Sequence, residues 1–327
     1  MGGKIMVTGG CGMVGAFVCR GLLSGGYEPV VVDTRTDRRL VADIEKHCAF
    51  DPADVRDLPR ILEIAKAHKV EAIIHLAGLV GPDVERRPWS SIQTNLLGTV
   101  TMLECARLAG IGRVSFPSSK MVYVPVPERC RHPIYEAVPE DIALSPQKLY
   151  AKIKRTNEDL ATHYASLYGL DVVALRFGSA FAPGKAGRFA ITNPVMSMIE
   201  AAAAGIPYKA EKGGDQCDDL CYSGESANGF MAVLASPPRH GHFRAYNISH
   251  GELISLRQMA DTLQNMIPGW RAEIGPGLDY RNYGLGAYFR MSLKKASEEI
   301  GYRPKFDFRL AAGDYIETQR RLSKLRS

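Results

Sequence analysis

Residues 8–15 read Thr-Gly-Gly-Cys-Gly-Met-Val-Gly and point to one class of fold. The apolar run from Lys4 to Thr8 predicts a buried strand, and a helix is expected over residues 12–24. The glycines between them predict a tight turn, a close approach of backbone to pyrophosphate and close packing of helix on strand, because each needs a missing Cβ. Free N–H groups at the helix start favour phosphate. A dinucleotide is therefore expected to contact Gly9, Gly12, Met13, Val14 and Gly15.

Outward from this stretch, apolar runs alternate with amphipathic stretches as far as residue 180. Further strands are expected at residues 29–33, 72–77, 113–118 and 171–177. Further helices are expected at residues 58–68, 92–109, 148–168, 194–204 and 226–235. Such alternation indicates right-handed βαβ units. We expect an α/β fold: a doubly wound parallel sheet of the Rossmann type over residues 1–180, and a smaller C-terminal substrate-binding lobe over residues 181–327 that crosses back to the sheet.

The composition of the 327 residues is that of an ordinary globular protein, with 46% hydrophobic residues and a net charge of +6. The basic C-terminus lacks interleaved aromatic residues, so we expect no nucleic-acid partner. Apolar runs are too short to span a bilayer and the chain enters a strand at once, so we expect no membrane partner and a cytoplasmic location. Seven cysteines without a CxxC pair, and histidines without a cluster, predict no metal site.

A carboxylate at the end of the second expected strand indicates the cofactor. Asp33 is placed to accept both hydroxyls of an adenosine ribose and to repel a 2′-phosphate, so we expect NAD. Arg35, Arg38 and Arg39 follow closely and leave NADP open as the alternative. No GK[ST] sequence is present, which excludes a P-loop kinase or ATPase.

Tyr150 and Lys154 stand four residues apart in an expected helix, so that phenol and ammonium share one face. Oxidation of an alcohol needs a group that takes the hydroxyl proton as hydride leaves, and a free phenol with a pKa of about 10 is too weak a base. An adjacent ammonium and a positive nicotinamide favour the phenolate. Ser119, at the end of an expected strand, is placed to orient the same substrate oxygen. We predict Ser119, Tyr150 and Lys154 as the catalytic residues.

Further motifs make the chain resemble, over essentially its whole length, the extended short-chain dehydrogenases/reductases, the epimerase/dehydratase group of UDP-glucose 4-epimerase. These motifs are TGGCGMVG at 8–15, DPADVRD at 51–57, HLAG at 75–78, NLLGT at 95–99, FPSSKMVY at 116–123, YNI at 246–248, SL at 255–256 and GYRP at 301–304. The resemblance implies that Ser119, rather than Ser118, is the catalytic serine and that Asp54 lies at the adenine. It implies further cofactor contacts from Val55, Leu76, Ala77, Gly78, Asn95, Tyr150 and Lys154.

The chain departs from the family pattern at positions that bear on the substrate. Lys120 follows Ser119 where sugar dehydratases carry an acidic residue, so dehydration is not expected. Ser179 replaces an asparagine that helps to bind sugar nucleotides. Asp218 occupies the position where the family has an arginine that binds the pyrophosphate. An aspartate there would replace a bidentate contact with repulsion. Two alternatives stay open: a register shifted by a few residues, or a phosphate contact from Arg281 or Arg290.

We therefore expect NAD-dependent oxidation of a secondary or anomeric hydroxyl of a small sugar, sugar acid or hydroxy acid. The residues expected at the substrate are Lys120, Arg176, Ser179 and Asn193. The candidate partners of a substrate carboxylate are Arg176, Lys185, Arg188 and Lys209. One alternative is a nucleotide-sugar epimerase that retains NAD. Another is an inactive NAD-binding regulatory protein, against which the intact catalytic residues argue.

The resemblance also implies a homodimer built from the helices at residues 92–109 and 148–168. The apolar candidates for that interface are Met102, Cys105, Ala106, Leu160, Tyr164 and Leu167. The same residues are equally suited to the core of a single chain.

Overall fold

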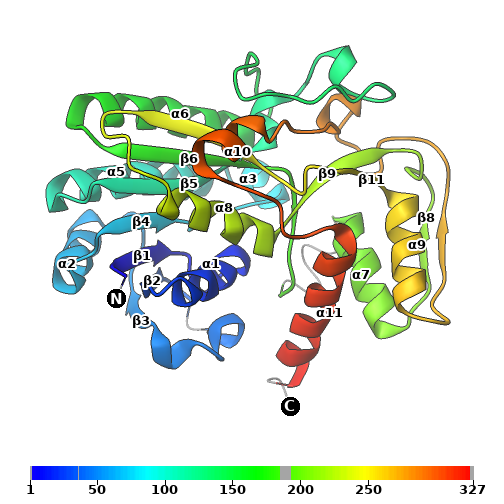
Figure 1. Ribbon diagram of the computed structural model, residues 1–327, viewed down its shortest axis with the longest axis horizontal. Coiled ribbons are helices and arrows are strands. Elements are labelled where there is room, and N and C mark those ends of the chain that lie inside the picture. The colour runs from blue at the N-terminus through cyan, green and yellow to red at the C-terminus, as the bar shows by residue number, and fades with distance from the viewer. Residues whose placement is uncertain (1, 36, 185–192, 325–327) are drawn as a thin grey trace.

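The computed structural model describes residues 2–35, 37–184 and 193–324. The strands of its main sheet are β1 (Lys4–Thr8), β2 (Glu28–Asp33), β3 (Ala49–Pro52), β4 (Ala72–His75), β5 (Arg113–Ser119), β6 (Asp171–Phe177) and β10 (Phe243–Ile248). They lie in the order β3-β2-β1-β4-β5-β6-β10, and every neighbouring pair is parallel (Figure 1). The strand order reverses between β1 and β4, the point where such sheets bind ligands. The predicted doubly wound α/β fold is confirmed.

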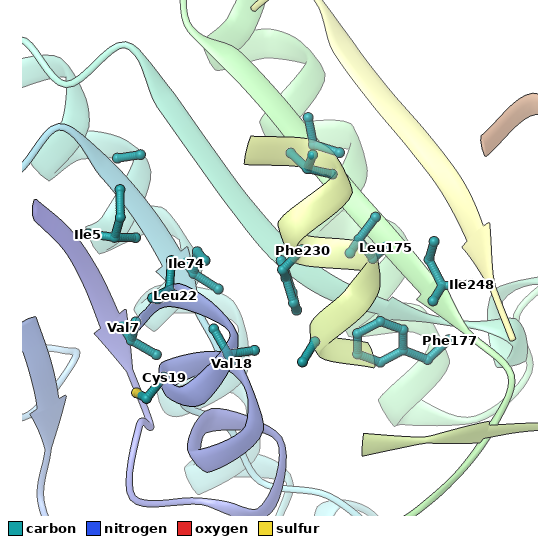
Figure 2. Close-up of a cluster of buried hydrophobic side chains, with 14 of the residues drawn as sticks. Ile5, Val7, Val18, Cys19, Leu22, Ile74, Leu175, Phe177, Phe230 and Ile248 are labelled. Atoms are coloured by element: carbon teal, nitrogen blue, oxygen red, sulfur yellow. The ribbon is translucent and has the colours of Figure 1, made fainter. Parts of the chain in front are cut away.

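Helices cover both faces of this sheet. One face carries α1 (Met13–Ser24), α8 (Ser223–Ala235) and α10 (Lys294–Ile300), and the other carries α2 (Leu58–His68), α5 (Gly98–Ala109) and α6 (Leu149–Tyr168). Successive side chains of a strand point to opposite faces, so Ile5 and Val7 enter the first core and Met6 the second. Figure 2 shows the first core, where Leu22 of α1 and Phe230 of α8 lie over the sheet.

A smaller lobe follows β6. Its elements are β7 (Ser179–Phe181), α7 (Pro194–Ala204), β8 (Tyr208–Ala210), β9 (Cys217–Tyr222), β11 (Leu253–Ser255), α9 (Leu256–Met266), β12 (Ala272–Ile274) and α11 (Phe308–Lys324). They enclose a hydrophobic core of their own, while α8 and β10 return to the main sheet (Figure 1). No helix among the described residues is long and apolar enough to cross a membrane. The division into two domains at residue 180 stays a prediction.

Two parts of the fold differ from what the sequence pattern indicates. The helix expected at 92–109 begins with a short α4 (Pro88–Ser91) and a π-helical stretch, η3 (Ile92–Leu97), before α5. The strand β10 gives no apolar run because two of its buried residues are polar. Arg244 pairs with Asp171 at 2.5 Å, and Asn247 accepts a hydrogen bond from Tyr123 at 2.8 Å. These partners are remote in sequence, so the pattern of residues alone does not reveal the strand.

Candidate active site

The turn between β1 and α1 contains three glycines, Gly9, Gly12 and Gly15, and leaves little room for a Cβ at these positions. Gly9 has a φ of +69°, and a Cβ there would lie 2.7 Å from the nitrogen of Ala77. A Cβ on Gly15 would lie 2.3 Å from the Gly9 oxygen, because α1 packs directly on the turn. Gly12 is more open: a Cβ there would meet only the Gly9 oxygen, at 3.0 Å. The turn therefore has the shape that a dinucleotide pyrophosphate requires.

A cavity of about 290 Å³ runs from this turn to the end of β2. It is lined by the residues expected around the adenosine half of the cofactor, namely Gly9, Gly12, Met13, Val14, Gly15, Asp33, Asp54, Val55, Leu76, Ala77 and Gly78. The Asp33 carboxylate accepts the N–H groups of Cys11 at 3.1 Å and Arg35 at 3.0 Å. A carboxylate offers about four lone-pair sites, so capacity remains for ribose hydroxyls.

Two of the three arginines that left NADP open are bound to other carboxylates. Arg38 pairs with Glu45 at 2.7 Å, and Arg39 pairs with Asp37 at 2.5 Å. Arg35 does line the cavity. The carboxylate of Asp33 in the same lining suits a ribose without a 2′-phosphate.

A second cavity, of about 540 Å³, adjoins the first along residues 76–80. The predicted site residues that line it are Asn95, Ser119, Lys120, Tyr150, Lys154 and Ser179. Tyr150 and Lys154 lie in the first two turns of α6, and Lys154 Nζ is 5.7 Å from the centre of the tyrosine ring. Lys154 Nζ also donates to the Pro117 carbonyl at 2.6 Å. The fold thus brings the three predicted catalytic residues together at one cavity wall.

Burial governs the protonation of Tyr150 in the protein by itself. Burial raises the pKa of Tyr150 to about 12, and a hydrogen bond with Ser119 opposes the rise. Burial lowers the pKa of Lys154 to about 8. The expected shift of the phenol toward neutrality includes the positive charge of a bound nicotinamide, so it stays a prediction for the NAD-loaded enzyme.

Asn95 ties the cofactor cavity to the catalytic helix. Its side chain accepts from Leu79 N–H at 2.7 Å and donates to the Leu79 carbonyl at 2.8 Å, which fixes a segment shared by both cavities. Its backbone oxygen accepts from the side chain of Asn157, in α6, at 2.9 Å. Asn95 lies in the π-helical stretch η3, and such bulges frequently occur at functional sites.

Glu85 caps the catalytic helix, and sequence reasoning missed it. Its carboxylate accepts the backbone N–H groups of Leu149 at 3.2 Å and Tyr150 at 3.1 Å. The residue before the helix, Lys148, makes no capping hydrogen bond with its side chain. Glu85 lies in α3 (Pro82–Arg86), far away in sequence, so no local capping motif signals the contact. It fixes the backbone of Tyr150 and places a negative charge at the helix start.

A buried polar cluster forms another part of the cavity wall. Lys120 donates to Asp218, and the Ser179 hydroxyl donates to the same carboxylate at 2.5 Å. The Tyr280 hydroxyl donates to it at 3.4 Å. Burial lowers the pKa of Lys120, and the nearby Asp218 opposes this. Two predicted substrate residues, Lys120 and Ser179, therefore meet through Asp218, the residue at the family's arginine position.

The other predicted substrate residues take structural roles instead. Arg176 is a correction: its guanidinium binds Glu158 at 2.6 Å and the Tyr123 hydroxyl at 2.8 Å, and it does not line the cavity. Asn193 is a second correction, because its side chain caps α7 by accepting the N–H of Val195 at 3.2 Å. Both predictions failed because a buried polar residue suits an internal partner as well as a ligand.

Of the remaining candidate carboxylate partners, the structure describes Lys209, which does not line the cavity. Lys209 is exposed and pairs with Glu211 and Glu273. Lys185 and Arg188 lie outside the described residues. Of the two arginines considered for a phosphate contact, Arg281 lines the cavity, whereas Arg290 is exposed and does not. Among the described residues, no group of three or more His, Cys, Asp or Glu side chains is arranged to hold a metal ion.

The residues proposed for a dimer interface differ in exposure. Met102, Cys105 and Ala106 are fully buried in the chain's own core, which is the alternative that the sequence left open for them. Leu160 and Tyr164 of α6 are partly buried. Leu167, by contrast, is 57% exposed near the end of α6, beside the half-exposed Tyr168. An interface here would use α6 more than the face of α5 first considered.

Comparisons with known proteins agree with this fold and cofactor. The family model described as "NAD dependent epimerase/dehydratase family" matches residues 5–249. UDP-glucose 4-epimerase of Rhizobium meliloti (strain 1021) is 25% identical over 93% of each chain. A solved UDP-glucose-4-epimerase from Stenotrophomonas maltophila with bound NAD and formylated UDP-arabinopyranose superposes with a TM-score of 0.85 at 21% identity, covering 98% of this chain and 99% of the other.

L-threonine dehydrogenase from Clostridium difficile also shares the fold, with a TM-score of 0.76 at 22% identity over 97% of each chain. The family model spans well over half of the chain, and the matched range includes the glycine turn, Asp33 and the segment that holds Tyr150 and Lys154. The predicted family and cofactor are confirmed. The chain belongs to the NAD-dependent epimerase/dehydratase family and is an NAD-dependent enzyme of the extended short-chain dehydrogenase/reductase type.

Proposed function

We propose that the enzyme oxidises a secondary or anomeric hydroxyl of a small sugar, sugar acid or hydroxy acid. The observation that carries this proposal is the buried carboxylate of Asp218 in the cavity wall. A carboxylate at this position cannot supply the bidentate contact that an arginine would make to a pyrophosphate. Lys120 is held in an ion pair with that carboxylate, so it is not free to replace the contact.

In the proposed reaction Tyr150, as the phenolate, takes the proton of the substrate hydroxyl. The C–H bond on the same carbon breaks, its electron pair leaves as hydride, and the alcohol becomes a carbonyl. When bound, NAD supplies the hydride acceptor and the positive charge that favours the phenolate. Ser119 holds the substrate oxygen, and Lys154 stabilises the phenolate from the same helix.

The second candidate is a nucleotide-sugar epimerase that keeps NAD bound and returns the hydride to the other face of the sugar. The names of the relatives favour it, since UDP-glucose 4-epimerases match along nearly the whole chain. The fold itself does not require a nucleotide, because an L-threonine dehydrogenase shares it. Asp218 therefore decides our preference for a small free substrate.

A thermal-shift titration of the NAD-loaded protein separates the two candidates. The ligands are UDP, GDP and dTDP on one side and free aldoses, sugar acids and hydroxy acids on the other. We expect stabilisation by a free compound, and NADH formation from it in the absence of any nucleotide. A clear rise in melting temperature with one nucleotide would overturn the proposal in favour of an epimerase.

We also propose that the enzyme is a cytoplasmic homodimer. Exposed apolar side chains near the α5–α6 face, including Leu97, Leu108 and Leu167, support the dimer. Light scattering of the purified protein gives the molar mass directly. A monomer at micromolar concentration would contradict the dimer.

A further inference from the structure

Two cysteine thiols meet between α1 and the edge of the main sheet. Cys19 of α1 is fully buried in the first core (Figure 2). Cys48 lies directly before β3, is half-buried and packs against the same core. The Cys19 thiol donates a hydrogen bond to the Cys48 sulfur. The two side chains are therefore in contact although 29 positions separate them in the sequence.

The contacts around the pair hold the two segments in place. Arg20, the residue after Cys19, donates to the Leu40 carbonyl at 2.7 Å and to the Asp43 carboxylate at 2.5 Å. Leu40 itself packs against the first core. The chain that leads to Cys48 is therefore fixed along α1. Because the two sulfur atoms already meet through a hydrogen bond, small rotations of the side chains bring them to bonding distance.

The surroundings give the two thiols different reactivity. The hydrogen bond from Cys19 lowers the pKa of the Cys48 thiol, and the positive charge of Arg20 acts in the same direction. The same hydrogen bond, together with burial, raises the pKa of Cys19 well above its ordinary value. The thiolate is the form that reacts with oxidants, and Cys48 is also the more exposed of the two side chains. Cys48 is therefore suited to react first and Cys19 to react second.

We propose that Cys19 and Cys48 form a redox modification site, which hydrogen peroxide converts into a reversible disulfide. The Cys48 thiolate attacks one peroxide oxygen, the O–O bond breaks, and the leaving hydroxide takes up a proton to become water. Cys19 then attacks the sulfenic acid on Cys48. The S–S bond forms, the S–O bond breaks, and the hydroxyl leaves with the thiol proton as a second water. Two thiols thus lose two electrons in total, and the peroxide gains them.

The disulfide would close a loop within the cofactor half of the molecule. The enclosed residues, 20–47, include β2 and Asp33, whose carboxylate lines the cavity at the glycine turn. A cross-link over a loop of this length stabilises a protein mainly by restricting the unfolded chain. Oxidation should therefore make this half harder to unfold. This inference goes beyond the proposed function and does not depend on the identity of the substrate.

The test treats the purified full-length protein with hydrogen peroxide and counts free thiols under denaturing conditions with Ellman's reagent. Peptide mapping of the wild type by mass spectrometry identifies the linked cysteines, and thermal unfolding is followed before and after treatment. The variant is Cys48→Ser. The matched control is Cys217→Ser, because Cys217 is also half-buried but lies in β9 of the smaller lobe.

We expect the wild type to lose two of its seven free thiols and to yield a peptide that links Cys19 to Cys48. Its melting temperature should rise by about 5 °C, and dithiothreitol should reverse both changes. Cys48→Ser should lose no thiol and show no rise, whereas Cys217→Ser should behave as the wild type does.

Three results would overturn the inference. In the first, the wild type keeps all seven thiols, or the linked peptide contains Cys11 in place of Cys19 or Cys48. In the second, Cys48 is oxidised in a way that dithiothreitol does not reverse, which would show that Cys19 does not react with the sulfenic acid. In the third, the cross-linked protein melts at the same temperature as the reduced protein, which would contradict the stabilising loop.

Discussion

The two halves of the active-site cleft are built in different ways. The cofactor half comes mainly from backbone: the turn at residues 9–15 and the ends of β1, β2 and β4 shape it, and missing side chains give it room. The adjoining half, where we propose that the substrate binds, comes from side chains, with Lys120, Ser179, Asp218 and Arg281 drawn from four separate segments. A site built from backbone can be recognised from a short motif in the sequence. A site built from side chains depends on which distant residues come into contact in the fold.

This contrast also separates what the family shares from what distinguishes this enzyme. A dinucleotide presents the same pyrophosphate and ribose to every member, so one local solution serves all. Substrates differ, and the residues that meet them can change while the sheet stays the same. Asp218 and Lys120, which depart from the pattern that the sequence resemblance implies, form a buried ion pair in the cavity wall.

The largest effect is expected where the two halves meet. Tyr150→Phe removes the proton acceptor, and kcat should fall about 10²- to 10⁴-fold, the usual contribution of acid/base catalysis. NAD affinity, measured by calorimetry, should stay close to that of the wild type. An unchanged function in a variant without this hydroxyl would instead identify the protein as an NAD-binding regulator.

Breaking the substrate half should cost stability as well as activity. Lys120→Met leaves the buried carboxylate of Asp218 without its cation, and the free energy of unfolding should fall by about 3–5 kcal/mol. The double variant Lys120→Met/Asp218→Asn should recover part of this loss. Urea unfolding measures both. If Lys120→Met were as stable as the wild type, Lys120 would not be neutralising the buried carboxylate of Asp218 as we describe.

A substitution in the glycine turn of the cofactor half should lower stability because it disturbs packing. A Cβ on Gly15 would lie 2.3 Å from the Gly9 oxygen, so Gly15→Ala should lose about 1–3 kcal/mol of stability and weaken NAD binding. The matched control is Gly313→Ala in α11, where the nearest atom lies 3.7 Å away. That variant should be neutral or up to about 1 kcal/mol more stable, because alanine favours the helix. Equal losses in the two variants would contradict the packing argument.

A smaller effect should follow from the cap on the catalytic helix. Glu85→Ala removes the acceptor for the N–H groups of Leu149 and Tyr150. A loss of about 1 kcal/mol at the helix start is typical, and a shift of that size in the transition state lowers kcat about 5-fold. Glu85→Gln keeps an acceptor oxygen and should retain most of the activity. If both variants reduce kcat equally, the charge of Glu85 matters rather than the cap.

A further effect concerns pH. Burial lowers the pKa of Lys154 to about 8 from its ordinary value near 10.5. Between these values the unfolded state binds more protons, so the contribution of Lys154 to stability rises from pH 8 toward 10.5 and is lost as the pH falls through 8. The stability of the wild type relative to Lys154→Met should therefore increase over this window. A flat difference in urea unfolding would contradict the lowered pKa.

Sequence reasoning succeeded where the signal is local. The glycine spacing, the carboxylate of Asp33 and the four-residue spacing of Tyr150 and Lys154 need no knowledge of distant contacts. It failed for Arg176 and Asn193, whose partners Glu158 and Val195 satisfy them inside the protein. A polar side chain has the same appearance in the sequence whether it meets a ligand or an internal partner.

The sequence by itself determined the parallel sheet, the NAD-binding turn and the order of the catalytic residues along the chain. Each follows from periodicity or spacing within a few residues, and backbone geometry translates such patterns directly into structure. The tertiary structure alone decided that Asp218 joins Lys120 to Ser179 and that Glu85 caps α6. These contacts join distant segments, and their positions are fixed only when both cores pack against the sheet.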